Sequence, residues 1–179
     1  MAIHFAEGEL NDRREAAAAE LARRGLDGLL MFRQESMYYL TGYDTFGYVF
    51  FQCLYMGADG ETLTLLTRTP DLRQARHTSI ISDIRVWYDA EGVNPADDLR
   101  EILEQHGSRG KRLGIETDAY GLTGFNLKRV EAALDGFCAL VEASDLVTRL
   151  RAVKSEAEIS YMPTCARRHD SPTSPSTEP

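Results

Sequence analysis

The stretch Tyr48–Leu66, which reads YVFFQCLYMGADGETLTLL, decides the fold class. Its first part, Tyr48–Met56, is rich in aromatic and β-branched residues, and Thr62–Leu66 is a second apolar segment. Between them, Gly57–Gly60 contains an Asp-Gly pair, which favours a tight turn between antiparallel strands. The stretch therefore predicts a β-hairpin.

Helix and strand signals alternate on both sides of this hairpin. Short apolar segments predict further strands at Gly28–Phe32, Ile84–Tyr88, Leu113–Glu116 and Phe137–Val141. Helical patterns cover Asn11–Arg24 before Gly25, Glu35–Leu40 before Gly42, Pro70–Thr78, a segment that begins at Asn94-Pro95, and a segment around Leu127, Val130 and Leu134 before Gly136. Strands separated by helices predict an α/β fold: a mixed β-sheet of about six strands with one hairpin, flanked by helices.

Composition and charge narrow the class of protein. The chain has 179 residues, of which 43% are hydrophobic and 27% charged, as in ordinary globular proteins. Its net charge of −8 argues against nucleic acid as a partner. The longest uncharged stretch, Thr45–Ala58, is shorter than the ~20 apolar residues that span a bilayer, so no membrane partner is expected. Sparse cysteines and an N-terminus without a signal-peptide pattern predict a cytoplasmic protein.

Familiar catalytic motifs are absent from the sequence. It contains neither a glycine-rich phosphate loop nor Gly-x-Ser-x-Gly, Cys-x-x-Cys or His-Glu-x-x-His. The four histidines are scattered and are better explained as helix-end or surface residues than as ligands. These observations predict no catalytic residue and no metal site in this chain.

Two segments nevertheless resemble a known family. Glu35–Tyr43 (ESMYYLTGY) resembles the N-x-x-Y-L-T-G segment of the creatinase/prolidase family of Xaa-Pro peptidases, with Ser36 where the family often has Asn. Leu150–Ile159 (LRAVKSEAEI) resembles the R-x-V-K-S-x-x-E-I segment that joins the family's N-terminal and catalytic domains, and Gly114–Glu116 matches its G-x-E strand. The resemblance covers residues 10–162 approximately and implies a creatinase/prolidase N-terminal domain with a ribonuclease H-like motif.

The same segments suggest how the chain is divided. We expect residues 1–150 to form the N-terminal domain and residues 151–162 to be a linker and the start of a truncated catalytic-domain helix. Ser155 and Glu158 have the spacing of a capping box, which opens a helix. Pro163 is expected to stop that helix, and residues 163–179, rich in Pro, Ser and Thr, are expected to be a disordered tail.

The resemblance also implies a function. Members of the family hydrolyse their substrates in a C-terminal domain, where two Asp, one His and two Glu hold a pair of divalent metal ions (Mn, Co or Zn). None of these ligands maps onto this chain, so we expect it to be inactive by itself. Its expected role is that of an N-terminal domain which forms a homodimer and completes the substrate site, with a peptide substrate bound only when a catalytic domain is present.

Candidate site residues follow from one loop of the family. Creatinase-like members carry Phe-Gly-Arg after the Leu-Thr-Gly segment, on a loop that reaches the partner subunit's active site. This chain has Phe46-Gly47-Tyr48, and Tyr48 lacks the cation that would bind the carboxylate of creatine. Tyr43, Phe46 and Tyr48 are therefore the candidate residues for contact with a substrate and a partner subunit.

Three alternatives stay open from the sequence. Phe46 and Tyr48 flank a predicted strand, so they could instead pack within the sheet. The chain could be a free-standing interaction or regulatory module that binds a peptide or a partner enzyme. It could also be an unrelated small α/β enzyme whose site the sequence does not reveal.

Overall fold

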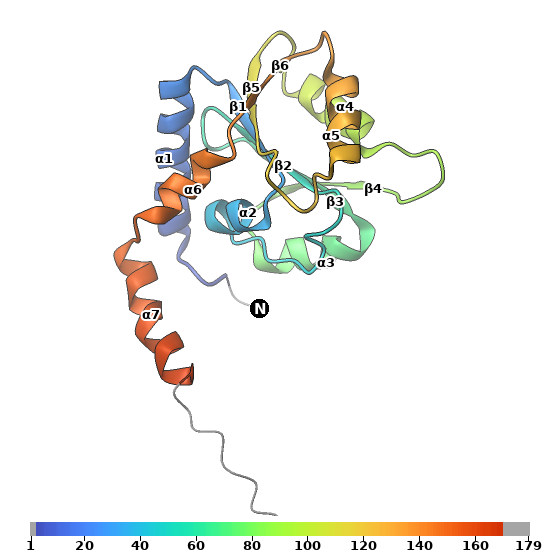
Figure 1. Cartoon of the computed structure of the whole chain (residues 1–179). Helices are drawn as coiled ribbons and strands as arrows, with labels where there is room; N and C mark the ends of the chain where they lie inside the picture. The colour runs from blue at the N-terminus through green and yellow to red at the C-terminus, as the bar shows by residue number, and fades with distance from the viewer. Residues whose placement is uncertain (1–2, 170–179) are drawn as a thin grey trace, which may run out of the picture.

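The computed structural model describes residues 3–169 of the chain, with the side chains of residues 3–162. Its centre is a six-stranded sheet in the order β4-β3-β2-β1-β5-β6 (Figure 1). Strand β2 is antiparallel to both of its neighbours, and the remaining neighbouring pairs are parallel. The strands are β1 (Gly28–Met31), β2 (Cys53–Gly57), β3 (Leu63–Arg68), β4 (Asp83–Trp87), β5 (Arg112–Ile115) and β6 (Ala139–Glu142). The mixed sheet and the β2–β3 hairpin confirm the predicted fold class.

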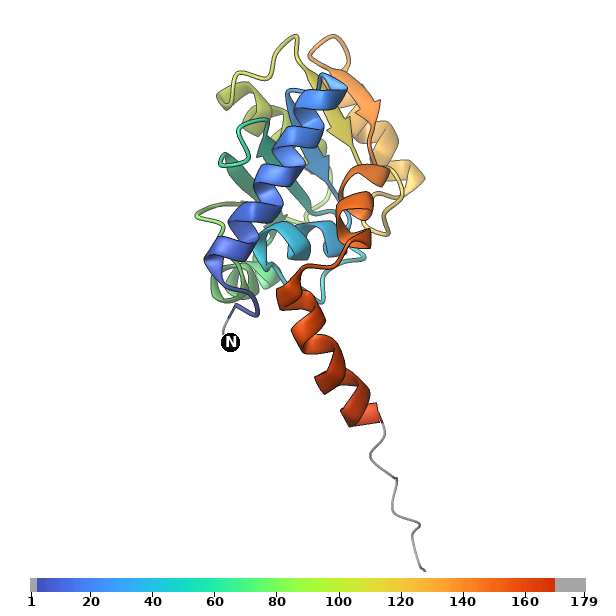
Figure 2. The same cartoon turned by 90° about the vertical axis from the view of Figure 1, so that its left-hand side faces the viewer.

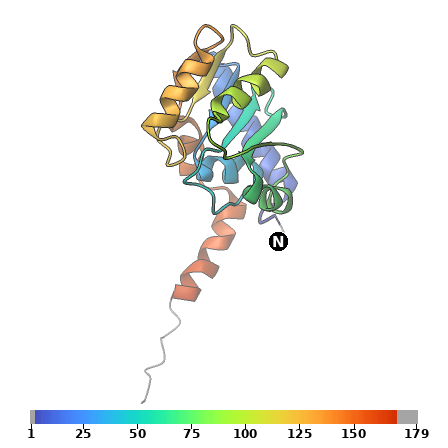
Figure 3. The same cartoon turned by 90° about the vertical axis from the view of Figure 1, so that its right-hand side faces the viewer.

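Helices cover both faces of the sheet and give it two hydrophobic cores. One face carries α1 (Glu7–Arg24), α2 (Gln34–Thr41), α3 (Thr69–Thr78) and α6 (Asp145–Ala152), as Figure 2 shows for α1, α2 and α6. The other carries α4 (Pro95–Gln105) and α5 (Gly124–Leu134), which lie in front of the sheet in Figure 3. Strand β1 serves both cores, because Leu29 and Met31 point to one face and Leu30 to the other.

Local signals place most helix ends correctly. Gly25 ends α1 and Gly42 ends α2, each with a positive φ that glycine adopts without strain. The Asn94 side chain accepts a hydrogen bond from the Ala96 N–H at 3.2 Å and so caps α4. Helix α1 begins at Glu7, earlier than the predicted Asn11, and Leu10 on this extra turn is fully buried.

The largest difference from the predicted elements lies before β2. The strand predicted over Tyr48–Met56 begins only at Cys53, and residues 48–52 belong to a loop. The reason is that the Gln52 side chain bonds back to the Gly47 carbonyl, at 2.8 Å, and folds the segment onto itself. An aromatic and β-branched composition favours a strand, but here the side-chain hydrogen bond of Gln52 decides against it.

The end of the described chain also differs from expectation. The capping box is confirmed: the Ser155 N–H donates to Glu158 at 3.0 Å, and the Glu158 N–H donates to the Ser155 hydroxyl at 3.2 Å. The helix that it opens, α7 (Glu156–His169), continues through Pro163, so the expected stop there is wrong. A proline inside a helix removes one N–H from the helical ladder and crowds the carbonyl four residues earlier, which weakens the helix but does not always end it. The rest of the predicted tail, residues 170–179, lies outside the described residues.

Two further features concern the same region. Helix α6 had no counterpart among the predicted elements, and it crosses the expected domain boundary at residue 150. Helix α7 leads away from the sheet (Figure 2), but its first turns contact the N-terminal segment, where the Tyr161 hydroxyl donates to the His4 carbonyl at 2.8 Å. Among the described helices, none combines the length and the apolarity needed to cross a membrane.

Candidate functional site

The loop between α2 and β2, residues 42–52, rests on a buried polar base. Tyr43 is fully buried, and its hydroxyl donates to the Gln52 side-chain oxygen at 2.5 Å. The Thr67 hydroxyl donates to the same oxygen at 2.9 Å, while the Gln52 amide nitrogen donates to the Gly47 carbonyl at 2.8 Å. Gln52 therefore ties the middle of the loop to strand β3.

A second set of contacts fixes the loop to helix α3. The Thr45 hydroxyl donates to Asp71 at 2.9 Å and accepts the Gly47 N–H at 2.9 Å. A β-carbon at Gly47 would lie within 2.6 Å of the Asp71 carboxylate and 2.5 Å from the Gln52 amide, so a larger residue would displace these two side chains. The Arg68 guanidinium bonds to Asp71 at 3.3 Å and stacks 3.4 Å from the centre of the Phe50 ring.

Above this base the loop exposes apolar side chains. We call residues 46–50 the loop tip; its exposed apolar members are Phe46 (88% exposed), Tyr48, Val49 and Phe50. The alternative that Phe46 and Tyr48 pack in the sheet is therefore wrong. Tyr43 does not belong to the exposed surface: it is part of the base, and burial raises the pKa of its hydroxyl. The three candidate residues of the sequence thus separate into two surface residues and one structural residue.

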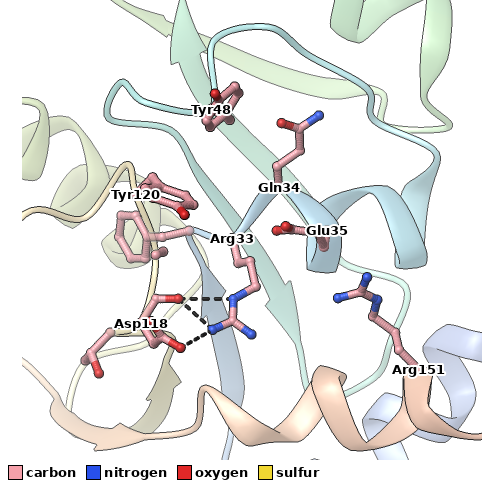
Figure 4. Close-up of a pocket in the computed structure, with 10 residues that line it drawn as sticks. Arg33, Gln34, Glu35, Tyr48, Asp118, Tyr120 and Arg151 are labelled. Carbon is pink, nitrogen blue, oxygen red and sulfur yellow. Dashed lines mark hydrogen bonds and ion pairs between the residues drawn. The ribbon is translucent and has the colours of Figure 1, made fainter.

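Beside the loop tip is a cleft of about 700 Å³ (Figure 4). It opens where β1 and β5 end, between the segment that enters α2 and the segment that follows β5. Its lining residues are Phe32, Arg33, Gln34, Glu35, Tyr48, Thr117, Asp118, Ala119, Tyr120 and Arg151. Tyr48 therefore belongs both to the loop tip and to the cleft.

A buried carboxylate joins the two segments beneath the cleft. Glu116 is fully buried and accepts the N–H groups of Phe32 at 3.1 Å and Arg33 at 3.0 Å, together with the Ser36 hydroxyl at 2.5 Å. Burial raises the pKa of Glu116 to about 7, although these hydrogen bonds oppose the rise. These hydrogen bonds connect the end of β5 to the start of α2. Glu116 itself is too deeply buried to contact a ligand.

Of the cleft residues, only Tyr48 was among the candidate site residues of the sequence. Arg33 and Asp118 form an ion pair at 2.6 Å, and both lie within three residues of the end of an apolar strand. The signal that could have found them is the position of polar residues just after adjacent parallel strands, where α/β proteins place ligand sites. The sequence predicts where these two strands end, but it does not predict that β1 pairs with β5.

The remaining chemistry-bearing side chains serve the fold. Within the described residues, no group of three or more His, Cys, Asp or Glu could hold a metal ion. His106 ends α4, bonds to the Thr64 hydroxyl at 2.8 Å and packs against the Tyr55 ring. Cys53 is buried, which raises the pKa of its thiol and keeps it unreactive.

The mixed six-stranded sheet with helices on both faces defines an α/β domain. The sequence profile of the Creatinase/Prolidase N-terminal domain matches residues 13–153. The chain belongs to this family. The resemblance drawn from Glu35–Tyr43 and Leu150–Ile159 is thereby confirmed, and the alternative of an unrelated small enzyme is excluded.

Individual relatives agree with this assignment. An uncharacterized hydrolase/peptidase of Sinorhizobium fredii is 26% identical over 89% of this chain, and ectoine hydrolase of Halomonas elongata is 29% identical over 90%. Among solved structures, a dipeptidase of Pyrococcus horikoshii is 28% identical and superposes with a TM-score of 0.71 over 88% of this chain and 41% of that protein. The chain spans 42% of the length of each of the two curated relatives, so it corresponds to one domain of such proteins.

Proposed function

We propose that this chain works as the N-terminal domain of an Xaa-Pro dipeptidase- or aminopeptidase-like metallohydrolase, where it forms a homodimer and completes the substrate site of the partner subunit. The observation that carries the proposal is the exposure of Phe46, at 88%, on a loop that is otherwise fixed by buried hydrogen bonds. Residues 1–150 would be the domain, and residues 151–162 would lead toward the catalytic half.

The physical argument for association concerns the loop tip. Four neighbouring apolar side chains are exposed there, although burying them would release ordered water. Contiguous apolar patches on a protein surface mark interaction sites. Since the base of the loop is already ordered, association would cost little further conformational entropy. An isologous contact between two copies is the commonest arrangement for such a surface.

The loop tip also bears on the substrate. Tyr48 is exposed and offers a phenolic hydroxyl that donates or accepts a hydrogen bond but carries no fixed positive charge. This supports a peptide or another amide as substrate over creatine, whose carboxylate would need a cation at this position. Phe46 would provide an aromatic wall for the same site.

Hydrolysis itself is assigned to residues outside this domain. A divalent metal pair (Mn, Co or Zn) would supply a bound hydroxide and polarise the scissile carbonyl. The described residues form no cluster that could hold such a pair. We expect the purified chain, assayed with each of these ions, not to hydrolyse Xaa-Pro dipeptides. Turnover that copurifies with the chain and is abolished by a chelator would overturn the assignment.

Self-association is tested by sedimentation equilibrium of the full chain over a wide range of concentration. The proposal predicts a reversible monomer–dimer equilibrium, weak because the loop tip is a small patch. A chain that stays monomeric at the highest concentration reached would contradict the role in dimer formation.

A further inference from the structure

The cleft beside the loop tip lies at a position where α/β folds bind ligands. Strands β1 and β5 are parallel neighbours, with Leu29 paired to Gly114. After β1 the chain enters α2 on one face of the sheet, whereas after β5 it reaches α5 on the opposite face. The two connections therefore diverge and leave a crevice at the carboxyl ends of the strands, which is the topological switch point of the sheet.

Several polar groups of this cleft are already satisfied internally. The guanidinium of Arg33 bonds to the Asp118 carbonyl and carboxylate, and its Nη1 donates to the Thr148 hydroxyl at 2.8 Å. Glu116 occupies the N–H groups of Phe32 and Arg33 at the entrance to α2. Neither Arg33 nor these backbone amides are free to hold an anion.

Two opposite charges in the cleft are unpaired. Within residues 3–162, the exposed Glu35 side chain and the half-buried Arg151 side chain take part in no hydrogen bond and no ion pair, although both line the cleft. Figure 4 shows them on the same side of the cleft, with the Arg151 guanidinium turned toward it. Each of these two charges can make a charge-assisted hydrogen bond to a ligand group of the opposite charge.

The opposite side of the cleft is aromatic. Tyr48 and Tyr120 pack edge to face with their ring centres 6.0 Å apart, and both rings are exposed. Figure 4 places Tyr120 across the cleft from Arg151 and Glu35. Rings held in this way offer an apolar surface for the side chain of a small molecule whose charged end lies at the other side.

The geometry points to a binding site for a small zwitterion of the amino-acid class within this domain. Its carboxylate binds Arg151, its ammonium group binds Glu35, and its apolar side chain lies against Tyr48 and Tyr120. The site uses residues of a single chain, so it requires neither the dimer nor a metal ion. It extends the proposed function by giving the N-terminal domain a ligand of its own.

The test measures ligand binding to the full chain by NMR titration, with L-phenylalanine as the probe. N-acetyl-L-phenylalanine lacks the ammonium charge, and L-phenylalaninamide lacks the carboxylate. We expect L-phenylalanine to bind with a dissociation constant of about 1 mM or below, as suits a molecule of this size. Each of the other two compounds should bind at least about tenfold more weakly, because each loses one charge-assisted contact.

Two variants assign the charges to residues. Arg151→Gln should bind L-phenylalanine and L-phenylalaninamide equally weakly, and Glu35→Gln should no longer distinguish L-phenylalanine from its N-acetyl derivative. The matched controls are Arg149→Gln, on the same helix and outside the cleft lining, and Glu131→Gln on α5. Both controls should retain the affinity of the wild-type chain.

Three results would overturn the site. One is the absence of binding by L-phenylalanine at concentrations well above the expected constant. Another is equal affinity for the three compounds, which would indicate contact with the ring alone. The third is that folded Arg151→Gln and Glu35→Gln still bind L-phenylalanine more tightly than its amide and its N-acetyl derivative, as the wild-type chain does.

Discussion

Phe46 and Phe51 lie in the same loop, but their environments are opposite. Phe46 is 88% exposed at the loop tip, whereas Phe51 is 4% exposed and packs edge to face against Phe32 and Trp87. The difference between Phe46 and Phe51 shows that an apolar side chain in this loop is not always buried in the core. The tip is held in place by buried polar side chains beneath it, which leaves its apolar side chains available for a partner.

The largest effect that the comparison predicts is on stability. Phe51→Ala should lower the free energy of unfolding by ~3–5 kcal/mol, because it removes a ring from a closely packed core. Denaturant unfolding followed by circular dichroism measures the change. The matched variant Phe46→Ala should change the same free energy by less than ~0.5 kcal/mol. Similar decreases in the free energy of unfolding for Phe51→Ala and Phe46→Ala would contradict the assignment of Phe46 to the surface and Phe51 to the core.

The buried carboxylate beneath the cleft should make stability depend on pH. Because burial raises the pKa of Glu116 from 4.5 to about 7, the folded state holds a proton that the unfolded state has released. The protonated Glu116 stabilises the folded state fully below pH 4.5, and this stabilisation is lost as pH rises through about 7. The free energy of unfolding should fall by up to ~3 kcal/mol over this range.

The control for this dependence is Glu116→Gln, which keeps the shape of the side chain and cannot ionise. Between pH 4.5 and 7 its free energy of unfolding should fall less than that of the wild type. Unfolding measured at intervals across this range provides the comparison. Parallel curves for the two proteins would show that Glu116 titrates at the same pH in the folded and unfolded chains.

The polar base of the loop should contribute an intermediate amount. Gln52→Ala leaves the Tyr43 hydroxyl, the Thr67 hydroxyl and the Gly47 carbonyl without their shared partner. We expect a loss of ~1–3 kcal/mol and faster proteolysis at the loop tip, since unpaired buried polar groups are costly. A variant with normal stability and normal resistance to protease would show that Gln52 does not hold the loop.

Much of the fold could be predicted from local sequence signals. Gly25, Gly42 and Asn94 mark helix ends through backbone and side-chain chemistry that acts within a few residues. The strand predicted over Tyr48–Met56 begins only at Cys53, because the Gln52 side chain bonds to Tyr43, Gly47 and Thr67, and a strand-forming composition does not reveal these bonds. The continuation of α7 beyond Pro163 was missed because a proline lowers helix stability without forbidding the helix.

The site was less predictable than the fold. The loop tip was found through the family resemblance, and exposure then separated Phe46 and Tyr48 from the buried Tyr43. The cleft was not found, because it depends on β1 and β5 lying side by side although Met31 and Arg112 are far apart in sequence. Sequence patterns identify strands, but the order of strands in a sheet is set by packing over the whole domain.

The central claim is that the loop tip serves association and not stability. Phe46→Ser tests it most directly, with sedimentation equilibrium and denaturant unfolding performed on the same samples. We predict that the variant shifts the dimer toward monomer and changes the free energy of unfolding of the monomer by less than ~0.5 kcal/mol. An unchanged association constant, or a destabilisation of ~3–5 kcal/mol as for a core aromatic residue, would contradict the claim.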